Sequence, residues 1–355
     1  MKKILNLIIC FIVTITLVSG CNSNKHFKLL NDMKYGQVYH KLTLLPDGRV
    51  LSIGNGITQI YDFNCDSWNS IESNYKHFNQ NQILLNNGNV IVLDVEGSEF
   101  FDSKTSKFYK IKPNITNMPM NNFSSILLEN GNILIIGLDG EKARIYDPEK
   151  NNFKLTDKMT CKRLEPEMLK LKNGNILILG GDKNNISIEI YDYKNNKFYN
   201  AGYLQIKRRG RYTRTGYKAT LLNNEKILIT GGYDDKNNVV KTVEIYDLAT
   251  KKSTILKNEF CQRGDKYYYK AILLQNGNVL FIGGFIEQNG KNIENAELFN
   301  LTNNHFITIG KSKYSRIGSD MVLLKSGNVL ITGGLGHSWF NETPPPLKKV
   351  ELYKY

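Results

Sequence analysis

Two short apolar runs joined by a turn form the basic pattern of this chain. In one copy, residues 271–274 are apolar, Asn276-Gly277 follows, and residues 279–282 are apolar again. Asn-Gly between two apolar runs predicts a hairpin. Because the apolar positions are consecutive rather than alternating, we expect strands that neighbouring sheets cover on both faces.

The second apolar run recurs along almost the whole sequence. Successive copies lie 40–52 residues apart, which matches four-stranded propeller blades and is too long for ankyrin or leucine-rich repeats. Repeats of one kind along 355 residues predict a single closed body rather than several domains. The seven copies open at Gly48, Gly88, Gly131, Gly174, Glu225, Gly277 and Gly327, where Glu225 marks a degenerate copy.

Each repeat continues with an aromatic residue followed by Asp or Asn, and then with a second aromatic seven positions later. Asp and Asn bond the backbone of tight turns, so this spacing predicts a third strand, a turn and a fourth, outer strand. The first aromatics are Tyr61, Phe101, Tyr146, Tyr191, Tyr246 and Phe299. The second are Trp68, Phe108, Phe153, Phe198 and Phe306, with Ser253 as the one departure.

Together these residues resemble the kelch repeat, which has a glycine pair after strand two, Tyr-Asp on strand three and Trp on strand four. The glycine pair is complete at Gly180-Gly181, Gly231-Gly232, Gly283-Gly284 and Gly333-Gly334, and eroded in the first three repeats. Phe mostly replaces the Trp, and the marks of WD40 and sialidase propellers are missing. The resemblance covers residues 26–355 and implies an all-β, seven-bladed β-propeller of kelch type with four-stranded antiparallel blades.

The last repeat ends at Tyr355 without a fourth strand. Residues 26–33 align with residues 152–159, the predicted fourth strand of the third repeat. We therefore expect the N-terminal strand to complete the last blade and close the ring, which removes an open sheet edge.

The first residues have the features of an export signal. Lys2 and Lys3 precede a mostly apolar run, residues 7–18, which is too short to span a membrane. Leu17-Val-Ser-Gly-Cys21 resembles the lipobox of bacterial lipoproteins. The resemblance implies a signal peptide (1–20), a tether (21–25) lipidated at Cys21, and a propeller body (26–355) anchored to the outer face of a bacterial membrane.

Charge and chemistry narrow the function only a little. Without residues 1–20 the chain has 45 basic and 33 acidic residues, a net charge of +12, which favours acidic polymers or anionic surfaces. A lysine-rich solvated surface is the alternative. Cys65, Cys161 and Cys261 are an odd set for a disulfide framework, the five histidines are dispersed, and no nucleotide fingerprint occurs, so no metal and no cofactor is predicted.

A four-stranded meander places the segments leading into strand one and the connections from strand two to strand three on one face. These segments are rich in Arg, Tyr and His in the last three repeats, which predicts a ligand-binding face there. The alternative for the arginines is to bond carbonyls around the central channel. The candidate ligand-binding residues are Arg208, Arg211, Arg263, Tyr268, Arg316, His337 and Trp339.

The favoured function is a monomeric, non-catalytic binding module for a glycan, an anionic polymer or a protein partner, and not for nucleic acid. The alternative is a sugar-modifying enzyme similar to the propeller epimerases of sialic acid, with acid–base residues on the same face. Its candidates are Arg163, Glu165, Glu167 and Arg211. The cysteine-linked Tyr and paired His of the galactose-oxidase-like copper enzymes have no specific match here.

Overall fold

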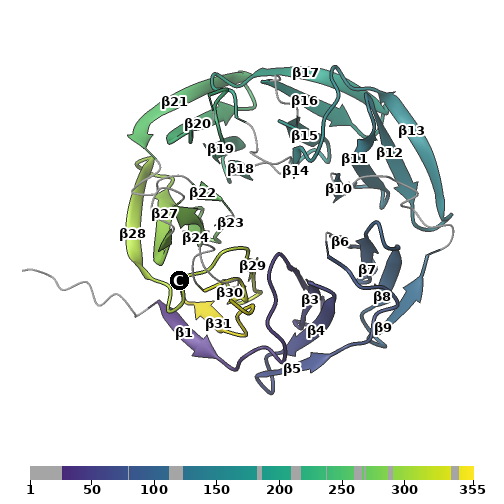
Figure 1. Ribbon diagram of the computed structural model, residues 1–355. Helices are drawn as coiled ribbons and strands as arrows, with labels where there is room; N and C mark the ends of the chain where they lie inside the picture. Colours follow the sequence, from purple (N-terminus) through teal and green to yellow (C-terminus); the bar gives the residue numbers. More distant parts are fainter. Residues whose placement is uncertain are drawn as a thin grey trace, which may run out of the picture.

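The computed structural model describes residues 26–78, 80–111, 123–181, 186–208, 217–236, 238–259, 266–267, 269–286, 291–336 and 344–355. Over these residues seven antiparallel four-stranded blades form a ring (Figure 1). This arrangement confirms the predicted all-β, seven-bladed propeller. The described residues contain no helix that could cross a membrane.

In the first four blades the strands follow one another in chain order from the centre outward. Blade one is β2 (Lys41–Leu44), β3 (Val50–Gly54), β4 (Ile57–Asp62) and β5 (Ser67–Ser70). Blade two is β6 (Asn81–Leu84), β7 (Val90–Leu93), β8 (Glu99–Asp102) and β9 (Lys107–Lys110). Blade three is β10 (Ser124–Leu127), β11 (Ile133–Asp139), β12 (Lys142–Asp147) and β13 (Asn152–Lys158). Blade four is β14 (Glu167–Lys170), β15 (Ile176–Leu179), β16 (Ser187–Asp192) and β17 (Lys197–Tyr203).

The last three blades include the longer connections and the ring closure. Blade five is β18 (Tyr217–Leu221), β19 (Lys226–Gly231), β20 (Thr242–Asp247) and β21 (Lys252–Glu259). Blade six is β23 (Lys270–Leu273), β24 (Val279–Ile282), β27 (Asn295–Asn300) and β28 (His305–Lys311). Blade seven is β29 (Asp320–Leu323), β30 (Val329–Thr332), β31 (Val350–Tyr353) and β1 (Phe27–Leu30).

The core lies between neighbouring blades. Every side chain of the second strands β7, β15, β24 and β30 is buried, as their consecutive apolar positions predicted. One apolar cluster joins Leu177 and Leu179 of blade four to Tyr217 and Ile227 of blade five. Each such aliphatic side chain contributes about 1.5–3 kcal/mol on burial. The blades therefore stabilise one another around the ring.

The N-terminal strand closes the ring. Phe27 pairs with Tyr353 and Leu30 with Val350, so β1 forms the outer strand of blade seven. Phe27 and Met33 are both buried. The predicted closure is confirmed, and β31 has no open edge.

The aromatic and acidic positions of strands three and four have the predicted roles. Tyr191 and Phe198 pack with ring centroids 4.8 Å apart, and the Asp192 carboxylate accepts a hydrogen bond from the Lys194 N–H of the turn at 3.0 Å. In blade five, Ser253 lies opposite Tyr246 in place of an aromatic. The aromatic pair therefore covers the outer edge of the blade interface, and the carboxylate fixes the turn beside it.

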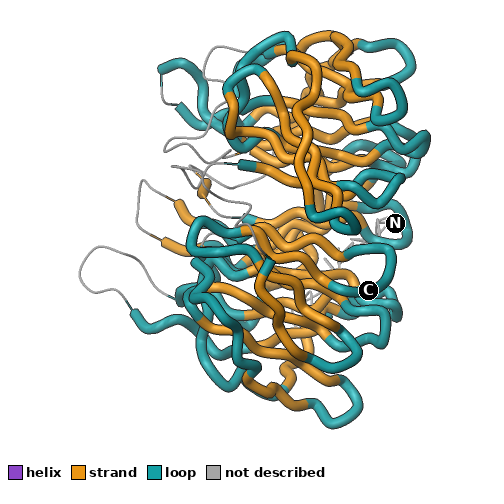
Figure 2. Tube along the Cα trace, turned by 90° about the vertical axis from the view of Figure 1, so that its right-hand side faces the viewer, coloured by secondary structure: helices purple, strands orange, loops and turns teal. Residues whose placement is uncertain are grey.

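The ends of the strands form two faces. We call the top face the one where strand one begins and where strand two connects to strand three. Val350 follows such a connection and Tyr353 ends β31, so the pairing of Phe27 with Tyr353 places the start of β1 on the opposite, bottom face. Figure 2 views the ring from its side, with the C-terminus at the same bottom face.

Candidate binding face

The two sets of segments that the sequence assigns to one face lie side by side in blades five to seven. In blade six, β22 (Lys266–Tyr267), β25 (Phe285–Ile286) and β26 (Lys291–Asn292) form a small three-stranded sheet. This sheet joins the segment before strand one to the connection after strand two. In blade seven the backbones of Ile317 and Leu335 exchange hydrogen bonds of 3.1 and 2.9 Å.

Blade five shows the same convergence through side chains. The Lys207 ammonium, just before strand one, lies 3.1 Å from the Asp235 carboxylate on the connection after strand two. Of the seven candidate ligand-binding residues named from the sequence, the structure describes Arg208 and Arg316. The others, with Cys21, lie outside the described residues; they are Arg211, Arg263, Tyr268, His337 and Trp339.

Arg208 and Arg316 are buried rather than presented to a ligand. Arg316 donates from Nε and Nη2 to the Glu351 carboxylate at 3.1 and 2.9 Å, and from Nη1 to the carbonyls of Gly333 and Lys349. Arg208 donates from Nε to the Glu244 carboxylate at 3.1 Å, from Nη1 to the Gly231 carbonyl and from Nη2 to the Thr242 carbonyl. These two arginines therefore have the alternative, structural role: each guanidinium bonds a carboxylate and backbone carbonyls of its own blade.

This buried arginine–glutamate pair, which we call the clamp, recurs in blade four as Arg163 and Glu189. Their side chains are fully buried, and Nε lies 2.8 Å from the carboxylate. The clamp glutamate always lies two residues before the first aromatic of strand three. Blade two has His77 in place of the arginine, with Nε2 2.7 Å from Glu99.

The second glycine of the kelch pair gives the clamp its space. A Cβ built on Gly232 would lie 3.0 Å from the Cβ of Arg208, and one on Gly334 would lie 3.2 Å from the Cβ of Arg316. Both glycines have positive φ, +88° and +92°, which other residues rarely adopt. The glycine pair therefore lets the arginine pack closely against the end of strand two.

His77 makes the blade-two clamp sensitive to protonation. Its Nδ1 lies 3.3 Å from the Asp94 carboxylate, and both partners are buried. Burial acts to lower the pKa of His77, but the hydrogen bonds to Asp94 and Glu99 outweigh it and raise that pKa above its usual value.

A second set of charges lines the top of the central channel. Near the start of each innermost strand, one residue pairs, across the hairpin, with the residue that precedes the glycine-pair position of strand two, so the set lies at one level. We call it the channel ring. Its members are Lys41, Asn81, Ser124, Glu167, Lys218, Lys270 and Asp320.

Neighbouring members of the channel ring are bonded across the blades. The Lys218 ammonium lies 2.8 Å from the Glu167 carboxylate, and the Lys270 ammonium lies 2.9 Å from Asp320. The other oxygen of Asp320 accepts a hydrogen bond from the Leu42 N–H at 2.8 Å. Three lysines against two carboxylates leave the channel ring with a net positive charge.

Lys41 carries this surplus charge. It is exposed to the water of the channel, and among the described residues its ammonium has no ion pair or hydrogen bond. Repulsion by Lys270 is the main cause that lowers the pKa of Lys41 to about 7, and desolvation by the channel walls lowers this pKa further. Asp320 acts in the opposite direction.

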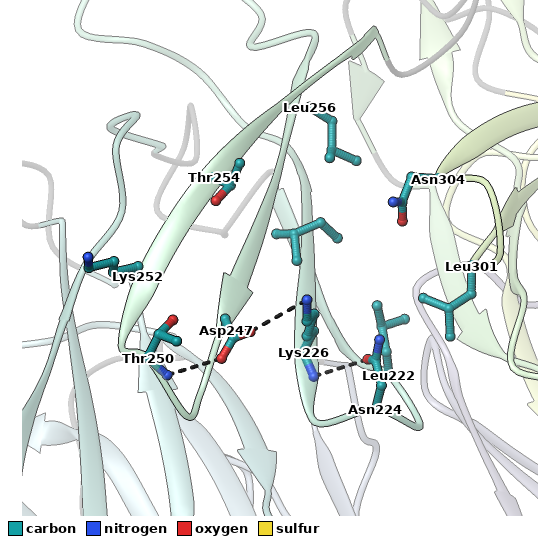
Figure 3. A pocket seen from close by; sticks show the side chains of 11 residues that line it. Leu222, Asn224, Lys226, Asp247, Thr250, Lys252, Thr254, Leu256, Leu301 and Asn304 are labelled. Atoms are coloured by element: carbon teal, nitrogen blue, oxygen red, sulfur yellow. Dashed lines mark hydrogen bonds and ion pairs between the residues drawn. The ribbon is translucent and has the colours of Figure 1, made fainter.

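The bottom face holds a pocket between blades five and six, with a volume of about 440 Å³ (Figure 3). Leu222, Ile245 and Leu256 supply its apolar wall, and Lys226 and Asp247 form an ion pair at 3.5 Å. In blade four the Tyr191 hydroxyl donates to Asn196 at 2.8 Å, whereas blade six has Phe299 at this position. The equivalent Asn304 lines the pocket, which lies far from the top face in the fold.

Comparisons with known proteins agree with the blades. The family model for the Kelch motif matches residues 214–258, which include blade five. No curated protein matches the chain.

Among solved structures, one described as "Novel fungal alcohol oxidase with catalytic diversity among the AA5 family, in complex with copper" is similar with a TM-score of 0.70. The likeness covers 92% of this chain and 76% of that chain at 18% identity, so it shows the fold alone. The described residues contain no group of three or more His, Cys, Asp or Glu that could hold a metal ion. The Kelch match and the seven blades together support a kelch propeller.

Proposed function

We propose that this chain is a membrane-anchored, extracytoplasmic binding module whose top face takes an anionic ligand, either a glycan or the acidic surface of a protein partner. The observation that carries the proposal is the channel ring, whose surplus positive charge opens on the same face as the converging segments of blades five to seven. A cleft or channel that is lined by charge of one sign attracts ligands of the opposite sign.

The structure changes the set of candidate ligand-binding residues. Arg208 and Arg316 leave the proposal, because the clamp already engages their donors. Arg211, Arg263, Tyr268, His337 and Trp339 stay in it as sequence candidates. Arg suits this role because its planar fork holds a carboxylate or phosphate through two parallel hydrogen bonds, and aromatic rings can stack on a sugar.

The position of β1 supports one orientation of the anchored protein. His26 lies on the bottom face, and a lipidated Cys21 is five residues earlier. A chain of that length reaches at most about 18 Å. In this proposal the bottom face therefore lies near the membrane and the top face points away from it. A Cys21→Ser variant of the full chain should move from the membrane fraction to the aqueous fraction, and unchanged partitioning would contradict the anchor.

The sugar-modifying enzyme remains the competing proposal. Of its candidates, Arg163 is buried in a clamp, whereas Glu167 lies in the channel ring, in an ion pair with Lys218. Turnover of a bound sugar, lost in a Glu167→Gln variant that still binds it, would favour the enzyme. Binding without turnover favours the module.

The direct experiment is a glycan and protein-partner screen with the chain beginning at residue 26, which contains all seven blades. We expect a ligand whose affinity falls with added salt and falls more than tenfold, or about 1.4 kcal/mol, in an Arg263→Ala, Trp339→Ala variant. The matched control is Arg49→Ala, which changes an arginine of a bottom-face turn. Equal losses in both variants, or no ligand at all, would contradict the proposal.

A further inference from the structure

We infer that the channel ring contains a binding site for a small oxyanion, held between Lys41 and Lys270, and that binding there is coupled to proton uptake. The inference deepens the proposed function by naming the chemical group that this site takes. It rests on that function only in that both use the top face. The oxyanion is a phosphate or a carboxylate, either free or as the acidic group of a larger ligand.

Lys41 and Lys270 belong to the same level of the channel, on either side of Asp320 in the order of the ring. Asp320 gives one oxygen to the Lys270 ammonium and the other to the Leu42 N–H, so its carboxylate is engaged. The Lys41 ammonium has no partner among the described residues, and Lys270 has ammonium donors beyond its one ion pair.

Lys41 faces the ammonium groups of Lys270 and Lys218 and the carboxylates of Asp320 and Glu167, and repulsion from Lys270 is the largest of these effects. His40, beside it in the chain, is buried, and burial lowers its pKa to about 4, so it adds no charge near neutral pH. An oxyanion between Lys41 and Lys270 attracts both ammonium groups and so offsets their mutual repulsion, while the Asp320 carboxylate opposes its binding.

Proton uptake follows from these charges. With a pKa of about 7, Lys41 is partly neutral near neutral pH in the free protein. A bound anion favours the charged ammonium and raises its pKa, since an opposite charge nearby always favours the ionised form. Binding at about pH 8 therefore takes up a proton, and it weakens as the pH rises further.

Apart from Asp320, the other members of the channel ring bond to partners away from Lys41 and Lys270. Asn81 donates to the Phe123 carbonyl at 3.2 Å, and Ser124 donates to the Pro166 carbonyl at 2.7 Å. Lys218 is paired with Glu167 of the neighbouring blade four. The excess positive charge is thus concentrated on the Lys41 and Lys270 side of the ring.

The test is isothermal titration calorimetry of the chain beginning at residue 26 with inorganic phosphate, glucuronate and, as a neutral control, glucose. We expect binding of the anions but not of glucose, with an observed enthalpy at about pH 8 that changes with the ionisation enthalpy of the buffer. Lys41→Met should weaken binding more than tenfold and remove the proton uptake. Lys197→Met, which changes an exposed lysine of the outer strand β17, should leave both unchanged.

Lys41 is exposed and unpartnered among the described residues, so the Lys41→Met variant should fold, and its circular dichroism spectrum checks this. No binding at anion concentrations up to roughly 10 mM, well above a millimolar Kd, would overturn the inference, as would equal affinity in Lys41→Met or binding without proton uptake. Phosphate and glucuronate separate the two sources of the oxyanion. If both bind but no glycan or protein partner is found, the proposed function fails and the oxyanion site stands.

Discussion

The clamps and the channel ring both place charges near the top of the propeller. The clamp charges are buried and paired, whereas the channel ring has three lysines for two carboxylates. In a clamp such as Arg316–Glu351, both side chains are fully buried, and the guanidinium also bonds backbone carbonyls. In the channel ring, Lys41 is exposed to water and has no partner among the described residues. A buried charge bonded to several partners holds the fold together, and one left in surplus is available to a ligand.

The largest expected effect is the loss of a clamp. Arg316→Ala leaves the Glu351 carboxylate buried without its partner, and removing one member of a buried pair costs about 3–5 kcal/mol. We expect a correspondingly lower free energy of unfolding in a urea titration. Arg316→Lys should recover little, because an ammonium cannot make the planar set of hydrogen bonds. A loss below about 1 kcal/mol would mean that the clamp does not stabilise blade seven.

A smaller effect should distinguish blade two from the arginine clamps. The pKa of His77 is raised in the folded state, so its stabilising charge is fully present below the unfolded pKa of about 6.5 and is lost as pH rises through the folded pKa. Replacement by arginine keeps the charge at all these pH values. His77→Arg should therefore remove the loss of stability that the original chain shows as the pH rises from mildly acidic to mildly alkaline.

The measurement for blade two is the melting temperature as a function of pH. The matched control is His305→Arg, which changes an exposed histidine of the outer strand β28 and should keep the pH dependence of the original chain. Parallel pH profiles for His77→Arg and the original chain would show that His77 does not titrate in this range.

The smallest expected effect is on the channel ring, and it has the opposite sign. The pKa of Lys41 is lowered to about 7 in the folded state, so charging it costs stability below that pH, and the cost is relieved as pH rises toward the unfolded pKa. Lys41→Met should therefore stabilise the protein by up to about 1 kcal/mol, since channel water screens the repulsion. Melting temperatures near pH 6 and pH 10 should differ from those of the original chain at the lower pH only. Destabilisation at both would mean that Lys41 is a structural residue like Arg316.

The fold followed from sequence because its signals are periodic. The glycines after strand two, the aromatic of strand three and the aromatic seven residues later recur at blade spacing, and the alignment of residues 26–33 with 152–159 predicted the closure. Each of these residues meets a backbone or packing requirement that most of the blades share. The sequence of a repeat protein therefore carries the signal for its fold once in each repeat.

The clamps had a sequence signal that was easy to miss. Glutamate recurs two residues before the first aromatic of strand three, at Glu99, Glu189, Glu244, Glu297 and Glu351. The arginine clamps of blades four, five and seven accompany complete glycine pairs, whereas blade two has Asp94-Val95 there and His77 in place of arginine. The sequence identified Arg208 and Arg316 but not their partners, because a glutamate on a strand gives no sign of being buried.

The channel ring had no comparable signal. Its members differ in chemistry and lie far apart in the chain, from Lys41 to Asp320. Only the register of each innermost strand against strand two brings them to one level. The surplus charge of Lys41 depends on how Lys270 and Asp320 pair in space, which a sequence alone does not give.

The most direct measurement is the titration of the lysine side chains by 13Cε NMR in the chain beginning at residue 26. The central claim predicts one lysine that titrates near pH 7, is absent from the Lys41→Met spectrum, and moves to higher pH when phosphate is added. If no lysine titrates near pH 7 and phosphate shifts none of the lysine signals, the channel ring holds no surplus charge for a ligand, which would contradict the proposed site.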